Sequence, residues 1–181
     1  TPVLAVVLTI LAGMTLFALM GYDAVETIRL IFVQPFTDPF SRSELLVKGT
    51  PLVLIAMGLS LGFRAGVWNI GAEGQFVIGA LCGGAMGLAF YDVEGIWLLP
   101  LMALAGAAGG WAWAMIPAIL KIKFNANEIL VSLMLVYVAA LLLSALVGGP
   151  LRDPDGFNFP ESRLFHDSAI LPLLIEGTRA H

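Results

Sequence analysis

The sequence predicts an all-α fold, a polytopic bundle of membrane-spanning helices with one broken or re-entrant segment. Hydrophobic residues make up 59% of the 181 residues and charged residues 12%, whereas soluble domains have about 25% charged residues. The mean hydropathy is +0.94. The apolar residues form long runs separated by short polar segments, as expected when helices cross a hydrocarbon core of about 30 Å.

Charge and cysteine content exclude several other classes. The net charge is −4 and the sequence has no basic run, so we expect no nucleic-acid partner. Cys82 is the only cysteine, and His166 and His181 lie far apart in sequence. An intrachain disulfide is therefore impossible, and no metal site, cofactor or catalytic residue is expected.

The first spanning helix is predicted at 2–21, which contain no charged residue. Twenty helical residues cover about 30 Å. Residues 22–48 contain too many charges to span. Within them, 24–33 favour a short amphipathic helix on the membrane surface, with a solvated loop as the alternative.

Two shorter apolar segments follow, and spanning helices are predicted at 49–63 and 76–91. Thr50 and Pro51 favour a helix start, with Thr50 as the N-cap. Both segments are short for a full crossing. Both carry glycines four residues apart, which share one helix face: Gly58, Gly62 and Gly66, then Gly79, Gly83 and Gly87. Such faces allow close helix packing and also occur in discontinuous transport helices.

After an acidic turn at 92–95, the next spanning helix is predicted at 96–120. It contains a further pair of glycines four residues apart, at 106 and 110. Pro117 is expected to bend or end this helix. Lys121 and Lys123 follow at once, which indicates the cytoplasmic side.

The last predicted spanning helix covers 129–147. Asn125 and Glu128 resemble a capping box, with Asn125 as the N-cap. Ser132 and Tyr137 are expected to form hydrogen bonds with neighbouring helices. Residues 151–168 form a polar loop, and 170–175 favour the start of another membrane segment.

The orientation follows from the lysines at 121 and 123. If they are cytoplasmic, the loops at 22–48, 92–95 and 151–168 face outward, and the stretch around Arg64 is inside or re-entrant. The proposed inside loops hold three basic residues and the longer outside loops hold five. The overall distribution of basic residues therefore does not by itself favour this orientation.

Residues 63–75 bring polar side chains and glycines into a region that is otherwise apolar. Polar groups and non-helical backbone at membrane depth are tolerated only where protein or a water-filled cavity surrounds them. This stretch is therefore the candidate for a transport path, with a polar loop at the membrane surface as the alternative. The candidate path residues are Arg64, Trp68, Asn69, Glu73 and Gln75.

Each candidate also has a structural interpretation. Glu73 would cost roughly 2.5–3.5 kcal/mol at a helix centre, so it needs a water-lined cavity or an ion pair with Arg64. Asn69 and Gln75 can donate and accept hydrogen bonds, either to a solute or to backbone groups freed by the glycines. Trp68 could stack on a solute or anchor the chain at the membrane boundary.

The same stretch resembles a known family. Residues 63–80, Phe-Arg-Ala-Gly-Val-Trp-Asn-Ile-Gly-Ala-Glu-Gly-Gln-Phe-Val-Ile-Gly-Ala, resemble the signature of bacterial ABC-importer permeases for simple sugars and nucleosides. These are related to the branched-chain amino acid permeases. Weaker agreement comes from Thr50-Pro-Leu-Val-Leu, Asn127-Glu128-Ile129 and Gly149-Pro150-Leu151.

The resemblance implies a transmembrane permease subunit of an ATP-driven importer in the bacterial inner membrane. Its expected partners are a second permease subunit, a cytoplasmic ATP-binding subunit and an extracytoplasmic solute-binding protein. No Walker-type phosphate-binding sequence occurs in the chain, so the chain is not expected to be an enzyme. We expect residues 1–181 to form one permease domain that is truncated at both ends.

Two other classes remain open. A secondary, ion-coupled transporter would also use broken helices, with Glu73 as a proton or sodium site, but it would be expected to show an internal repeat. A non-transporting membrane scaffold would explain the glycine faces but not the polar side chains of 63–75. Solute-stimulated ATP hydrolysis in a reconstituted complex would separate the importer from both.

Overall fold

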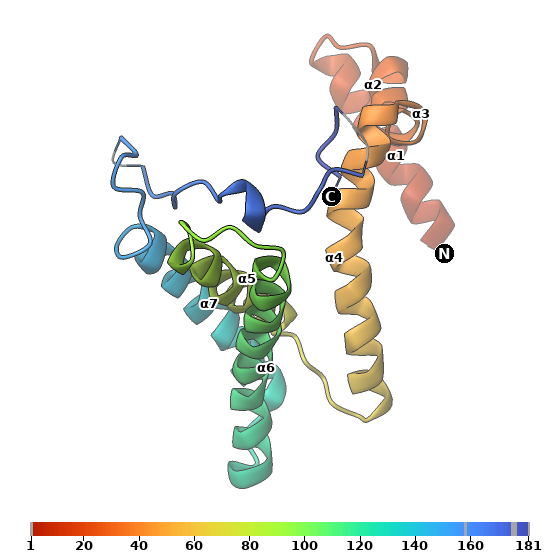
Figure 1. The fold of residues 1–181 in the computed structure, drawn as a ribbon. Coiled ribbons are helices and arrows are strands. Elements are labelled where there is room, and N and C mark those ends of the chain that lie inside the picture. Colours follow the sequence, from red (N-terminus) through yellow and green to blue (C-terminus); the bar gives the residue numbers. More distant parts are fainter. Residues whose placement is uncertain (1, 158, 175–176, 181) are drawn as a thin grey trace. The chain divides into compact units, whose positions relative to one another are not determined.

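The computed structural model describes residues 2–157, 159–174 and 177–180. The regular secondary structure of these residues consists of helices (Figure 1). The helices are α1 (Pro2–Leu19), α2 (Ala24–Phe32), α3 (Gln34–Thr37), α4 (Pro39–Arg64), α5 (Ala72–Ala89), α6 (Leu98–Phe124), α7 (Glu128–Val147) and the short 3-10 helix η1 (Asp167–Ala169). Among the described residues, β-type pairing is limited to one isolated antiparallel bridge between Arg152 and Ser162. The predicted all-α fold is confirmed.

Among the described residues, α1, α4, α5, α6 and α7 are long and apolar enough to cross a membrane. The chain divides into two compact units, Thr1–Val53 with Pro172–His181, and Leu54–Leu171. Helix α4 runs through the boundary between them. Whether 1–181 is one permease domain stays a prediction.

In the first unit, α1 ends two residues before its predicted end at 21. Gly21 has a φ of +83°, which favours glycine and turns the chain. The Asp23 carboxylate then accepts hydrogen bonds from the backbone amides of Val25 and Glu26, at 2.9 and 3.0 Å, and so caps α2. The helix predicted at 24–33 is confirmed.

Helix α4 begins ten residues before the predicted start, so the assignment of Thr50 as its N-cap is wrong. The backbone amide of Ser41 donates to the Asp38 carboxylate at 2.8 Å. This bond and a second one from the Ser41 hydroxyl hold the pKa of Asp38 below its ordinary value. Thr50 instead donates its hydroxyl to the carbonyl of Leu46 at 2.7 Å. Pro51 lies inside the helix, where it has no N–H to form a backbone hydrogen bond.

The same unit contains a contact between the end of the chain and α4. The Arg179 guanidinium donates two hydrogen bonds to the Glu44 carboxylate, one of them from Nε at 2.8 Å. A bidentate arginine–carboxylate pair fixes geometry better than a single contact does. It therefore joins 177–180 to the charged first third of α4.

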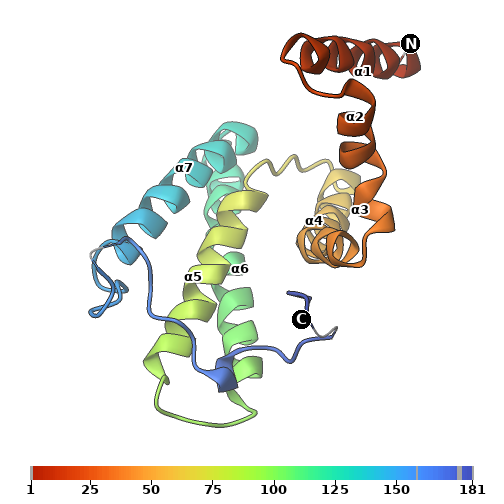
Figure 2. The ribbon, with the colours of Figure 1, turned by 90° about the horizontal axis from the view of Figure 1, so that it is seen from above.

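In the second unit, α5 packs along α6 and also contacts α7 (Figure 2). The predicted glycine faces at 79, 83, 106 and 110 lie in the α5–α6 interface. An ideal Cβ at Gly79 would lie 2.9 Å from the carbonyl oxygen of Gly106, and one at Gly83 would lie 3.0 Å from that of Met102. These distances leave no room for side chains, so the two backbones are in direct contact.

The turn between α6 and α7 differs from the prediction. Pro117 lies inside α6 and does not end it, and both lysines lie in its last turn. Asn125 has a φ of +51° and terminates α6, as asparagine can in the left-handed region. Asn127, and not Asn125, is the N-cap of α7, because its side chain accepts from the amides of Ile129 and Leu130 at 3.0 and 3.3 Å.

The polar loop predicted at 151–168 is confirmed over its described residues. It returns to the C-terminal end of α5, where the Arg163 guanidinium lies 4.4 Å from the centre of the Tyr91 ring. The Phe165 ring lies 3.3 Å from the position that a Cβ on Gly84 would take. Segment 170–175, expected to start a further helix, is irregular from Ile170 to Leu174.

Candidate functional site

The break between α4 and α5 is confirmed, but it is shorter than predicted. Residues 65–71 are non-helical, whereas Glu73 and Gln75 lie in the first turns of α5. The amide of Val67 donates to the carbonyl of Gly62 at 2.9 Å, which closes the end of α4. Gly66 has a φ of +72°, a conformation that permits the chain to turn out of the helix.

The end of the break rests on α7. The backbone amide of Ile70 donates to the Ser132 hydroxyl at 3.2 Å, and this hydroxyl donates to the carbonyl of Ile129 at 3.1 Å. Ser132 is 1% exposed. A Cβ at Gly71 would lie 2.9 Å from both the Cβ and the carbonyl oxygen of Ser132, so only glycine permits this approach.

Asn69 and Gln75 are brought together across the start of α5. The Asn69 carbonyl oxygen Oδ1 accepts from the amide of Gly71 at 2.9 Å. The Asn69 amide nitrogen Nδ2 donates to Oε1 of Gln75 at 3.2 Å. Asn69 therefore satisfies a backbone group freed by the break, as one of its two interpretations predicts, and orients Gln75 at the same time.

Two hollows adjoin this amide pair. The larger is a cleft of about 370 Å³ between the C-terminal half of α4 and the start of α5, and it contains both amides. Its lining residues are Ile55, Gly58, Leu59, Gly62, Asn69, Ala72, Gln75 and Phe76. None of these side chains is charged. The cleft therefore offers hydrogen bonds and an apolar wall to a neutral polar molecule.

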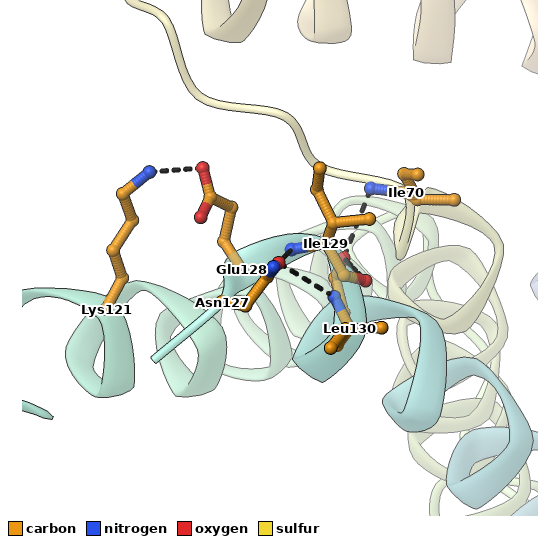
Figure 3. Close-up of polar contacts among 7 residues, drawn as sticks. Ile70, Lys121, Asn127, Glu128, Ile129 and Leu130 are labelled. Atoms are coloured by element: carbon orange, nitrogen blue, oxygen red, sulfur yellow. Dashed lines mark hydrogen bonds and ion pairs between the residues drawn. The ribbon is translucent and has the colours of Figure 1, made fainter. Parts of the chain in front are cut away.

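The smaller hollow, about 120 Å³, lies between the break, α6 and α7, and also reaches Asn69. Lys121 and Glu128 line it, and the Lys121 ammonium donates to the Glu128 carboxylate (Figure 3). The backbone amide of Trp68 interacts with the same carboxylate. This ion pair therefore ties the end of α6 to the start of α7 beside the break.

The other three candidate residues do not line the cleft. Arg64 and Glu73 are exposed, and no ion pair joins them within the described residues, so the expected pairing is not seen. Trp68 is 56% exposed and lies with its ring centre 5.2 Å from that of Phe63. Their roles in a solute path stay predictions.

Sequence reasoning expected Ser132 to bond a neighbouring helix, but its partner is the backbone of the break. The pair of Lys121 and Glu128 was not expected. Lys121 lies in the last turn of α6, and Glu128 and Ser132 lie in the first turns of α7. The close spacing of these polar residues around the turn was the signal that could have predicted their contacts. Tyr137 is 67% exposed, and in the part of the chain that the structure describes it makes no interhelical hydrogen bond.

The chain belongs to a family of membrane transport proteins. Residues 41–177 match the model of the family described as "Branched-chain amino acid transport system / permease component". The match includes the break, the cleft, nearly all of α4 and the whole of α5, α6 and α7. This family and the apolar helices identify a multi-pass membrane protein.

Several relatives have names that agree with this assignment. A glucose ABC transporter permease protein of Haloferax volcanii is 41% identical over 174 residues, which are 96% of this chain and 45% of that protein. A guanosine ABC transporter permease protein of Bacillus subtilis is 30% identical over 170 residues, 94% of this chain and 47% of that protein.

A nucleoside ABC transporter permease protein of Lactococcus lactis is 27% identical over 137 residues, which are 76% of this chain and 38% of that protein. The chain thus spans about half or less of the length of these relatives. No solved structure matches it significantly.

Proposed function

We propose that the chain is part of a permease subunit of an ATP-driven importer, which forms the path for a small polar solute such as a nucleoside or simple sugar. The family match over residues 41–177 carries this proposal. The names of the relatives, which specify glucose, guanosine and nucleosides, support the solute class.

The expected partners follow from the same assignment. An ATP-driven importer of this kind uses a cytoplasmic ATP-binding subunit, a second permease subunit and an extracytoplasmic solute-binding protein, and we propose these as the partners. We place the protein in a bacterial cell membrane with Lys121 and Lys123 on the cytoplasmic side. The loops at 92–95 and 151–168 then face outward.

We further propose that the solute path runs along the break. The cleft at Asn69 and Gln75 supports this, because amides can exchange hydrogen bonds with hydroxyl or base groups without adding a charge. Three exposed residues in or beside the break remain candidates: Arg64 at the end of α4, Trp68 in the break and Glu73 in the first turn of α5. A polar lining at membrane depth is otherwise costly.

The test is uptake by the full-length permease, assembled with its partner subunits in membrane vesicles, with radiolabelled glucose and radiolabelled guanosine as probes. Gln75→Leu is expected to lower ATP-dependent uptake about tenfold, as the loss of one hydrogen bond of about 1.4 kcal/mol at the cleft would do. Glu73→Gln is expected to lower uptake only if the exposed Glu73 carboxylate lies on the solute path. Gly71→Leu should lower uptake further, because its side chain would collide with Ser132.

Assembly is measured on the same membranes by co-purification of the ATP-binding subunit. Parental uptake by the Gln75 and Glu73 variants would remove both residues from the path. Variants that fail to assemble would show packing roles instead. Uptake that needs an ion gradient but no ATP would indicate a secondary transporter, and no transport of any probe by an assembled complex would favour a scaffold.

A further inference from the structure

Ser132 is the side chain through which α7 contacts the backbone of the break. Its hydroxyl lies between two backbone groups, accepting from the Ile70 amide at 3.2 Å and donating to the Ile129 carbonyl at 3.1 Å. The side chain is 1% exposed. The Ile70 amide therefore depends on a residue 62 positions away for its partner in the protein, and a non-helical amide at membrane depth needs such a partner.

Two glycines bring the break close enough for this bond. A Cβ at Gly71 would lie 2.9 Å from the Ser132 carbonyl oxygen, and one at Gly74 would lie 3.1 Å from Cα of Val136. Both glycines are buried. The break and the first turn of α5 thus lie directly on the backbone of α7 over Ser132 to Val136.

The position of the amide pair depends on this contact. Ile70 lies between Asn69 and Gly71 in the chain. Asn69 lines the cleft, and its side chain accepts from the Gly71 amide at 2.9 Å. Asn69 in turn bonds Gln75 at 3.2 Å. These two bonds of Asn69 join the break to itself and to α5, whereas the bond from the Ile70 amide to Ser132 joins it to α7.

We propose that Ser132 is a positioning residue of the permease. Its hydroxyl holds the break on α7 and thereby keeps Asn69 and Gln75 at the wall of the cleft. The consequence for uptake rests on the proposed function, whereas the mechanical role of Ser132 does not.

The mechanical role is tested by hydrogen–deuterium exchange of the purified full-length permease in detergent, measured by mass spectrometry on peptides that cover 66–73. Ser132→Ala removes the acceptor of the Ile70 amide and is expected to raise exchange at that amide about tenfold, as expected when one hydrogen-bond partner is lost. Gly71→Ala keeps the hydroxyl but pushes the break away, so it should have the same effect.

Two matched controls separate the bond from general loosening. Ser144→Ala removes an exposed hydroxyl from the same helix. Gly49→Ala adds a methyl group where no atom lies within 4 Å. Neither should change exchange at 66–73. Peptides from the α5–α6 interface serve as internal references, because a merely structural role of Ser132 would raise exchange there as well.

The role in transport is tested with the same variants in vesicles, again with glucose and guanosine as probes. Ser132→Ala and Gly71→Ala should lower ATP-dependent uptake in assembled complexes by about the factor by which they raise exchange, and the two controls should not. Unchanged exchange at Ile70 in Ser132→Ala would overturn the positioning role. Raised exchange with parental uptake would overturn its part in transport. If even the parental protein transports no probe, the proposed function fails while the exchange result still decides the role of Ser132.

Discussion

The α5–α6 interface and the C-terminal half of α4 both carry glycines four residues apart, and they use them differently. At Gly79 and Gly106, the ideal Cβ positions lie 2.9 and 3.1 Å from the carbonyl oxygen of the other residue. At Gly58, by contrast, an ideal Cβ would meet no atom within 4 Å in the described part of the chain. Gly58 and Gly62 instead line the cleft of about 370 Å³.

The difference shows that glycine spacing determines a helix face but not what lies against it. In α5 and α6 the absence of side chains allows backbone contact, which is a packing role. In α4 the same absence leaves space opposite Asn69 and Gln75. Larger side chains should therefore impair different properties at the two faces: folding at the α5–α6 interface and transport at the cleft face of α4.

The largest effect is expected at the packed face. Gly106→Leu would place a branched side chain where even a Cβ lies 3.1 Å from a carbonyl oxygen, and overpacking of this kind costs about 1–3 kcal/mol or more. We expect most of the full-length permease to be lost from the membrane fraction, and a lower unfolding temperature for what remains. Gly49→Leu, in open space, is the control. Equal yield of both variants would contradict the packing role.

A smaller, more selective effect is expected at Gly58. Gly58→Leu adds its Cβ without a collision, so yield and co-purification of the ATP-binding subunit should stay at the parental level. Because the side chain would fill part of the cleft, ATP-dependent uptake of glucose or guanosine should fall about tenfold. Parental uptake by the assembled variant would show that this cleft is not part of the path.

The smallest effect concerns thiol reactivity, which compares the two faces without a bulky substitution. The Cys82 sulfur lies in the α5–α6 interface, 2.5 Å from the position that a Cβ on Gly109 would take. A cysteine introduced by Gly58→Cys in a Cys82→Ala background should react with N-ethylmaleimide several times faster than Cys82 does. The two thiols should react equally in detergent-denatured protein. Equal rates in native membranes would mean that the two faces are equally covered.

Much of the fold could be predicted because apolar runs and glycines act locally. Composition along the chain predicts the five long helices, the break near Gly66 and Gly71, and the amphipathic α2. Helix ends were less predictable where signals competed. Both Pro39 and Pro51 favour a helix start. The helix begins at Pro39 because the Asp38 carboxylate accepts from the Ser41 amide and so caps it there. Of two nearby asparagines, Asn125 adopts a positive φ and leaves Asn127 to cap α7.

The candidate site was only partly predictable, because its contacts join distant segments. The polar residues of the break pointed to Asn69 and Gln75. Nothing in their own neighbourhood pointed to Ser132, whose bond to Ile70 crosses 62 positions. The ion pair of Lys121 and Glu128 likewise depends on the tight turn at Asn125. Spacing predicts helix faces, but tertiary packing decides which of them meet.

The length of α4 determines how deep in the bilayer the break begins. The helix has 26 residues, but its last charged residue before the apolar part is Lys48, whose ammonium belongs near the lipid headgroups. From Lys48 to Arg64 the helix rises about 24 Å, less than the about 30 Å of the hydrocarbon core. We therefore expect the break to start before the opposite headgroups are reached, and any tilt of α4 would place it deeper. At that depth the oxygens of Ser132 and Asn69, which accept from the amides of Ile70 and Gly71, would replace the water that a surface loop would have used.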